Sequence, residues 1–236
     1  MNKQKIKMTQ GYYEYESIPL YLGVKRINKE ISLDNLLLLK TILCEHDIIF
    51  LLAFGTLLGV VRDKDFISHD EDIDLIVWEE YKQKFFDLLP EMKNYGFEVA
   101  RYDRRELISI IRNGEYIDIY FFKDNGDGFN TSGAIFFPSN LIREATDYEF
   151  KHTLFKVPKE YISFLDYEYG NDWRTPIQWN DFEMPKWKRA LYTFKENVKN
   201  HLPDSIFFLL AKYSERNIHN RYVILYNNYI KSHSIK

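Results

Sequence analysis

Phe54-Gly-Thr-Leu-Leu-Gly59, followed by His69-Asp-Glu-Asp-Ile-Asp74, is the stretch that decides the fold we predict for this chain. The first part is a glycine–hydroxyl turn that continues into an apolar segment. The second part carries two carboxylates spaced i, i+2. Side chains two residues apart on a β-strand point to the same face of the sheet. Asp72 and Asp74 are therefore expected to project together from one strand, with Ile73 turned into the core.

This carboxylate pair predicts a magnesium site. Two like charges side by side repel each other, and a divalent cation between them relieves the repulsion. Mg²⁺ is usually held by one or two carboxylates together with substrate phosphates, and Mn²⁺ is the alternative metal. Metal-assisted phosphoryl or nucleotidyl transfer is the chemistry that such a pair indicates.

The apolar pattern around the motif predicts an α/β (α+β) core with a mixed sheet and flanking helices. A two-residue Asn113-Gly114 signal predicts a β-hairpin between alternating stretches. The expected helices cover 29–46 (with Ser32 or Asp34 as N-cap), 57–62, 79–95 and 158–169, and the region beyond Pro185. The expected strands cover 48–53, 72–78, 97–102, 107–112, 115–122, 134–137 and 149–157.

We divide the chain into three regions on this pattern. Residues 1–28 form an N-terminal lead-in, residues 29–158 form the catalytic core, and residues 159–236 form a mostly helical C-terminal region packed on the core. A chain of 236 residues is long enough to bury a sizeable core in this arrangement.

Three carboxylates are expected to converge in the core. Asp118 lies on the outgoing strand of the hairpin, and it would meet Asp72 and Asp74 if the two strands are neighbours. Three acidic groups can hold two metal ions about 3.5–4 Å apart. We therefore predict Asp72, Asp74 and Asp118 as catalytic and metal-binding residues.

Substrate-binding residues are expected on both sides of the carboxylate pair. Gly55 would let the backbone approach a phosphate, and the Thr56 hydroxyl would donate to its oxygens. Arg62 and Lys64 would neutralise a diphosphate. Two further residues, His69 and Asp70, are assigned to the rim of the same site.

The charge of the chain argues against nucleic acid as a partner, because the net charge is -3 and nucleic-acid-binding domains usually present a strongly basic face. Residues 186–236 nevertheless hold ten Lys and Arg against three Asp and Glu. This basic region is either a solvated helical face or a surface for an anionic membrane, acceptor or partner.

We find no signal peptide, so we expect a cytoplasmic protein, with peripheral contact at the inner face of the membrane as an option. The oligomeric state stays open.

Two segments together resemble the LicD family of phosphotransferases. They read Phe54-Gly-Thr-Leu-Leu-Gly-Val-Val-Arg62 and Phe66-Ile-Ser-His-Asp-Glu-Asp-Ile-Asp74. Weaker matches follow in the expected order at Ile117-Asp118-Ile119, Phe155-Lys-Val-Pro158 and Tyr169-Gly-Asn-Asp-Trp173. Ser68 and His69 stand where the family usually has Pro and Trp, and Glu71 replaces the middle Asp.

The resemblance implies the nucleotidyltransferase fold shared with polymerase-beta-like enzymes. It also implies transfer of a phospho-alcohol, phosphocholine-like or phospho-alditol, from a CDP-linked donor to a hydroxyl of a glycan or glycolipid. The acceptors would be lipopolysaccharide, capsule or teichoic acid. In that reaction Asp72 and Asp74 would hold magnesium on the diphosphate. Asp118 would complete a second metal site or take the hydroxyl proton.

Two other interpretations remain open from the sequence. A nucleotidyltransferase with the same site would attack the α-phosphorus of an NTP, modify a small molecule or protein, and release pyrophosphate. A non-catalytic binding protein could also retain this fold, although all three aspartates are present.

Overall fold

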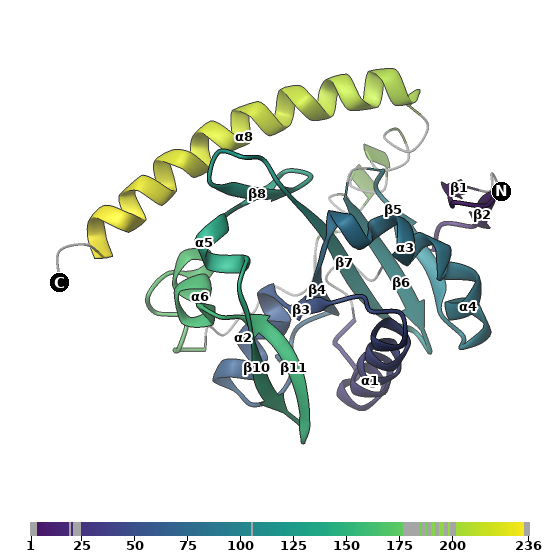
Figure 1. Cartoon of the computed structure of the whole chain (residues 1–236), viewed down its shortest axis with the longest axis horizontal. Helices are drawn as coiled ribbons and strands as arrows, with labels where there is room; N and C mark the ends of the chain where they lie inside the picture. Colours follow the sequence, from purple (N-terminus) through teal and green to yellow (C-terminus); the bar gives the residue numbers. More distant parts are fainter. Residues whose placement is uncertain are drawn as a thin grey trace.

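The computed structural model shows a mixed α/β chain built on one mixed sheet (Figure 1). It describes residues 4–18, 20, 25–104, 106–176, 185, 187, 190, 191, 194, 195, 198 and 202–233. The main sheet has the order β3-β4-β7-β6-β5, and β8 and β9 extend it from the end of β7. Its strands are β3 (Phe50–Leu52), β4 (Asp72–Trp78), β5 (Glu98–Tyr102), β6 (Leu107–Arg112), β7 (Glu115–Asp124), β8 (Phe129–Ser132) and β9 (Ile135–Pro138).

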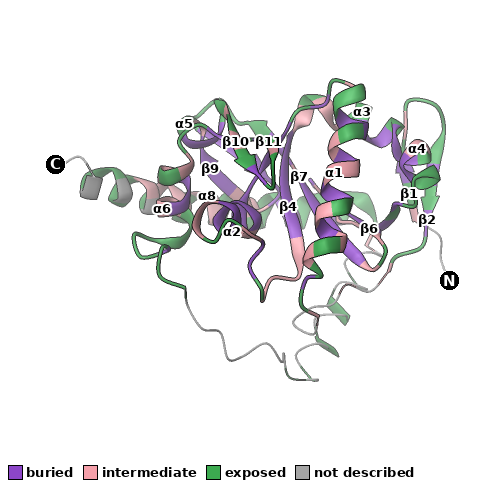
Figure 2. Cartoon of the chain, turned by 90° about the horizontal axis from the view of Figure 1, so that it is seen from below, coloured by how far each residue is buried: buried purple, intermediate pink, exposed green. Residues whose placement is uncertain are grey.

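The centre of the sheet is the parallel pair β4–β7, whereas the other neighbouring strands run antiparallel. Both strands are rich in β-branched and aromatic residues, which suit a pleated, buried surface. Figure 2 shows them buried along most of their length, with helix α1 (Lys29–Glu45) running alongside them. This central position is what brings the carboxylates of two strands together.

Helix α1 covers the sheet with the apolar face that its sequence pattern predicts. Leu36, Leu39 and Leu43 are fully buried on that face. The helix begins at the predicted residue, but its N-cap is Asn28, whose side chain accepts a hydrogen bond from the backbone N–H of Ile31 at 3.2 Å. The predicted caps were wrong because Ser32 and Asp34 both lie inside the helix.

Several elements differ from the predicted ones, and β8 and α5 (Ser139–Ile142) were not predicted. Helix α2 (Phe54–Arg62) begins three residues earlier than expected, so the glycine–hydroxyl turn is its first turn. The predicted helix over 79–95 is divided into a short 3-10 turn (Glu79–Tyr81), α3 (Lys82–Asp87) and α4 (Leu89–Asn94). Pro90 stands in the first turn of α4, where its missing N–H costs no helical hydrogen bond.

The predicted strand over 149–157 is in fact a hairpin of β10 (Ala145–Phe150) and β11 (Thr153–Pro158). Lys151 and His152 form its two-residue turn with φ of 49° and 62°. Such turns usually carry Asn or Gly, so these residue types gave no signal of a turn. The Asn113-Gly114 hairpin, by contrast, was predicted correctly, and both residues have positive φ.

The remaining helices frame one side of the sheet. Helix α5 (Ser139–Ile142) contacts α6 (Tyr161–Tyr169), and α6 in turn contacts α2. Helix α8 (Asp204–His233) is long, contacts β9, and runs along the top of the view in Figure 1. The lead-in, which we expected to be partly extended, holds the antiparallel pair β1 (Gln4–Lys7) and β2 (Tyr12–Tyr15).

Candidate active site

The strand register sets the carboxylates face to face. In the parallel pair, Asp74 of β4 lies directly opposite Asp118 of β7. Both are buried, with 7% and 3% of their surface exposed. Asp72 lies two residues earlier on β4, and Asp70 lies just before the strand. The sheet order therefore brings together the three aspartates that the sequence singled out.

The first turn of α2 fixes Asp74. The backbone N–H of Gly55 donates to the Asp74 carboxylate at 3.1 Å, and the Asp74 N–H donates to the Thr56 hydroxyl at 2.8 Å. Thr56 is 1% exposed, so its hydroxyl is not directed at an open space for substrate. We assign Thr56 to holding the carboxylate strand against α2.

Gly55 has no Cβ atom, and this allows two carboxylates to lie close to the backbone of α2. A Cβ atom at this position would lie 2.4 Å from Oδ2 of Asp70 and 3.3 Å from Oδ2 of Asp74. The preceding residue, Phe54, has φ of 44°, a conformation that bulky residues rarely adopt. Strain of this kind persists where surrounding packing imposes it, and the Phe54 ring packs edge-on against Tyr120 with centroids 5.1 Å apart.

Asp118 is held by two residues that sequence reasoning did not identify. The Ser109 hydroxyl donates to Oδ1 of Asp118, and the Arg101 guanidinium donates to Oδ2 at 3.0 Å. Arg101 also donates to the Ser109 hydroxyl at 3.2 Å. A two-residue turn at Asn113-Gly114 fixes Ser109 opposite Asp118, so the hairpin signal could have revealed Ser109. No comparable signal pointed to Arg101.

We call Asp70, Asp72, Asp74 and Asp118 the aspartate cluster. Burial raises the pKa of each of these carboxyls, and mutual repulsion adds to the rise at Asp72 and Asp74. Burial, followed by the charges of Asp74 and Asp118, raises the pKa of Asp72 well above its usual range. Burial and the charges of Asp70 and Asp118 do the same to the pKa of Asp74. Burial also raises the pKa of Asp118, while Arg101 and Ser109 oppose that rise. A cation would relieve this repulsion when it binds.

The geometry fits a metal ion held by two carboxylates, whereas we expected three. Across the described residues, no three Asp, Glu, His or Cys side chains are arranged as they stand to hold a metal ion. Both carboxylate oxygens of Asp118 already accept hydrogen bonds, whereas Asp72 and Asp74 share one strand face. The donor set that fits Mg²⁺ is therefore the Asp72–Asp74 pair, completed by substrate phosphates and water.

A cavity of about 410 Å³ opens over these carboxylates. It is lined by Phe54, Gly55, Asp70, Asp72, Asp74, Tyr120, Ile135, Glu168, Tyr169 and Tyr222. Six of these ten residues come from α6, α8, the start of β9 and the aromatic residues of α2 and β7, and none of the six was predicted as a site residue. The size suits a small-molecule ligand.

Four of the six predicted substrate-binding residues do not line this cavity: Thr56, which is described above, and Arg62, Lys64 and His69. The Arg62 guanidinium donates to the Asp63 carboxylate at 2.8 Å and to the Trp173 carbonyl at 3.3 Å. Lys64 donates from its ammonium group to the Tyr148 hydroxyl of β10. His69 is half-buried, and burial followed by the charge of Arg62 lowers its pKa.

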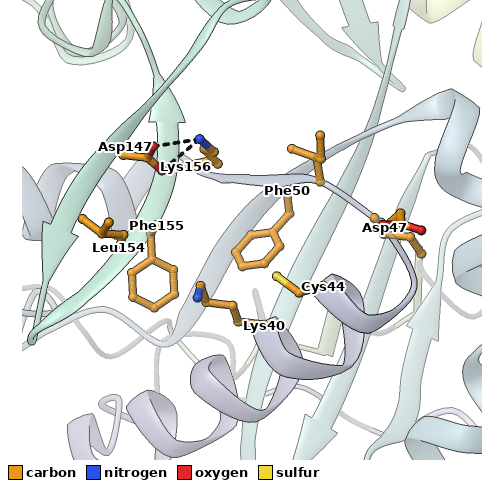
Figure 3. Close-up of a pocket in the computed structure, with 10 residues that line it drawn as sticks. Lys40, Cys44, Asp47, Phe50, Asp147, Leu154, Phe155 and Lys156 are labelled. Carbon is orange, nitrogen blue, oxygen red and sulfur yellow. Dashed lines mark hydrogen bonds and ion pairs between the residues drawn. The ribbon is translucent and has the colours of Figure 1, made fainter.

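A second cavity of similar volume lies between α1, β3 and the β10–β11 hairpin (Figure 3). Its lining includes Phe50, Leu154 and Phe155, together with an ion pair between Lys156 and Asp147 at 2.9 Å. Lys40 reaches over it from α1. Its lining contains no cluster of carboxylates, so the first cavity is the candidate active site.

The pKa of Asp70 leads to a testable dependence of stability on pH. Burial raises this pKa to about 6, compared with 3.8 for an exposed aspartate. The folded state therefore holds the proton more tightly than the unfolded chain, and the stability of the metal-free protein should fall as pH rises through that window. We expect Asp70→Asn to stabilise the protein at pH 7 by about 1–3 kcal/mol, and to have little effect at pH 4.

Denaturant unfolding in EDTA at the two pH values measures this effect. Asp172→Asn is the matched control, because Asp172 is exposed and distant in sequence from the carboxylate strand. Equal stabilisation by Asp70→Asn at both pH values would contradict the assignment.

A family model described as "LicD/FKTN/FKRP, nucleotidyltransferase domain" matches residues 47–170. The chain belongs to the LicD family. The match begins just before β3 and ends after α6, so it contains every residue of the aspartate cluster and its cavity except Tyr222. The resemblance seen in the sequence is thus confirmed, as is the predicted mixed α/β core with a C-terminal helix.

Other relatives of this LicD chain are distant. It is 30% identical over 88 residues to "Uncharacterized protein RT0683" of Rickettsia typhi, over 37% of this chain and 27% of that protein. The chain thus spans about a quarter of the length of that relative. Among solved structures, it is similar to the lincosamide antibiotic adenylyltransferase LnuA in its lincomycin-bound form, with 12% identity and a TM-score of 0.43, over 66% of this chain and 91% of that one. It is also similar to ANT(2")-Ia in complex with adenylyl-2"-tobramycin, with 13% identity and a TM-score of 0.38, over 76% and 92% of the two chains.

The helices that the structure describes include none with the length and apolar character needed to cross a membrane.

Proposed function

We propose that this LicD domain is a metal-dependent phosphotransferase that moves a phospho-alcohol from a CDP-linked donor to a hydroxyl of a cell-surface glycan. The observation that carries the proposal is the convergence of Asp72, Asp74 and Asp118 on two neighbouring strands, with an open cavity lined by Asp72 and Asp74. The family supports a transferase, and the cavity has the size of a small-molecule site.

In the proposed reaction, some residues would bind the metal ion and another would accept a proton. Asp72 and Asp74 would hold Mg²⁺, or Mn²⁺ in its place, which when bound neutralises the donor diphosphate. Gly55 keeps the backbone of α2 close to Asp74, and Thr56 keeps β4 in register with that turn. Positioning and electrostatic stabilisation supply most of the rate in reactions of this class.

Asp118 would accept the proton of the attacking hydroxyl. Burial raises the pKa of this carboxyl, so its ionised form is a stronger base, while Arg101 and Ser109 oppose that rise and fix the orientation of the carboxylate. The hydroxyl oxygen then bonds to the distal phosphorus of the donor, the bond from that phosphorus to the bridging oxygen breaks, and CMP leaves with that oxygen.

The test is incubation of the full chain with CDP-choline, CDP-ethanolamine, CDP-glycerol and CDP-ribitol, with Mg²⁺ and glycan acceptors. We expect acceptor-dependent release of CMP from at least one donor, and loss of that release in EDTA. Consumption of an NTP with release of pyrophosphate, and no CMP from any donor, would instead identify the nucleotidyltransferase.

We also propose that the protein works at the cytoplasmic face of a membrane, where a glycolipid acceptor would lie. Helix α8 exposes apolar side chains, among them Phe208, Leu209 and Tyr213, and belongs to the basic C-terminal region. Apolar and basic groups together favour anionic lipid surfaces. Co-sedimentation with vesicles containing anionic lipid, compared with neutral vesicles, tests this contact.

A further inference from the structure

The second cavity, between α1, β3 and the β10–β11 hairpin, has apolar walls (Figure 3). The described residues that line it include none of those that line the candidate active site. Its volume of about 410 Å³ suits a small-molecule ligand. The walls are Ile49 and Phe50 on one side and Leu154 and Phe155 of β11 on the other. Ile49 and Leu154 are 48% and 58% exposed, so two large apolar side chains meet water in the same hollow.

The aromatic part of these walls is held in place by contacts within the chain. The ring of Phe155 lies 6.5 Å from that of Phe50 and 6.2 Å from that of Phe150, measured between centroids. At the turn of the hairpin, the Lys151 ammonium group pairs with the Asp65 carboxylate at 3.0 Å. The cavity is therefore preformed, and a preformed site lowers the ordering cost of binding.

Lys40 carries a charge in this lining that no described residue neutralises. Its side chain is half-buried on α1, and its ammonium group lies 5.8 Å from the centroid of the Phe155 ring, with no carboxylate paired to it in the described chain. The other lysine of the lining, Lys156, pairs with Asp147 at 2.9 Å. Figure 3 shows the remaining carboxylate, Asp47, at the opposite end of the view from the Lys40 ammonium group. One cationic group thus stands over apolar walls.

We propose that this cavity binds an amphiphilic anion, with an aliphatic chain against the apolar walls and a carboxylate or phosphate on the Lys40 ammonium group. Apolar side chains offer no hydrogen bonds, so they suit an aliphatic chain better than a sugar or a nucleoside. Lysine binds carboxylate and phosphate alike as a compact charge. The ligand is either a fatty acid or a phosphate-bearing lipid, which share this chemistry. The site does not depend on the proposed transferase reaction.

Calorimetric binding of octanoate to the full chain tests the site, with 1-octanol as the uncharged ligand of the same chain length. We expect octanoate to bind at least about tenfold more tightly than octanol, because hydrogen bonds to charged groups contribute more than neutral ones. Hexanoate should bind about fifteenfold more weakly than octanoate, because each of the two missing CH₂ groups changes binding about fourfold when it is buried.

Four variants separate the charge from the walls. Lys40→Met keeps an apolar chain of similar length and should abolish the preference for octanoate over octanol, whereas Lys40→Arg should retain it. Lys84→Met is the matched control, because Lys84 is exposed on α3 and the substitution removes the same charge. Leu154→Gln changes an exposed wall residue and should weaken octanoate and octanol alike.

Cys44 provides a second measurement on the unmodified chain. It is the single cysteine of the sequence, and its exposed thiol belongs to the lining of this cavity. At an octanoate concentration of ten times Kd, mass action leaves about one tenth of the molecules unoccupied. Alkylation of Cys44 by iodoacetamide, an uncharged reagent, should therefore slow about tenfold.

Octyl phosphate assigns the source of the ligand. Tighter binding than octanoate identifies a phosphate-bearing lipid, and weaker binding identifies a fatty acid. Equal binding of octanoate and octanol, an unchanged preference in Lys40→Met, or an unprotected Cys44 at saturating octanoate would overturn the proposal. None of these measurements uses turnover, so their failure leaves the transferase function standing, and a failure to release CMP leaves this site standing.

Discussion

Replacing Asp74 with asparagine is expected to lower phosphotransfer by about 10²–10³-fold while making the metal-free protein more stable. Asp74 is the most centrally held carboxylate of the cluster, and asparagine can still accept the hydrogen bond from the Gly55 N–H. The substitution removes one negative charge from a site where Asp70, Asp72 and Asp118 repel it. Loss of activity together with a gain in stability distinguishes a functional carboxylate from a structural one.

Two measurements check this prediction on the same samples. Acceptor-dependent CMP release gives the loss of activity, and thermal unfolding in EDTA at pH 7 and above gives the gain in stability. The stability gain should shrink as pH falls, because the raised pKa of Asp74 means that the wild-type carboxyl is already protonated in acid. Asp172→Asn is again the control for stability. A stable Asp74→Asn variant with more than half of the wild-type rate would show that Asp74 is not part of the chemistry.

The two glycines of α2, one turn apart, are expected to respond to alanine in opposite ways. At Gly59 a Cβ atom would lie 2.6 Å from the backbone oxygen of Asp65 and 3.0 Å from the backbone nitrogen of Ile67. Backbone cannot move aside without displacing the loop that leads to the carboxylate strand. We expect Gly59→Ala to cost about 2–3 kcal/mol of stability, which lowers the melting temperature by about 4–12 °C.

At Gly55 the atoms in the way belong to the side chains of Asp70 and Asp74. The Asp70 carboxylate can rotate, and alanine is favoured over glycine within a helix by roughly 0.5–1 kcal/mol. We therefore expect Gly55→Ala to keep near-wild-type stability but to lose most activity, because the added methyl group displaces the carboxylates.

Thermal unfolding and CMP release of both variants, measured side by side, test this pair. Each variant serves as the control for the other, since both make the same substitution in the same helix. Similar losses of stability at the two positions would contradict the difference between backbone and side-chain contacts.

The sequence by itself determined the parts of this protein that depend on local pattern. Alternation placed Asp72 and Asp74 on one face of β4, apolar spacing gave α1, and Asn113-Gly114 gave the β6–β7 hairpin, because each of these signals acts over a few neighbouring residues. The LicD motif is likewise made of short stretches of sequence. The family model matches the chain from just before β3 to just after α6.

Only the tertiary structure decided which distant residues share the site. It set Asp118 opposite Asp74, turned Arg101 to the Asp118 carboxylate, and directed Arg62 to the Trp173 carbonyl. It also brought Glu168 and Tyr222 to the cavity from helices far along the chain. These placements follow from strand order and helix packing, which are set by burying the whole apolar surface at once, so no local stretch of sequence contains them.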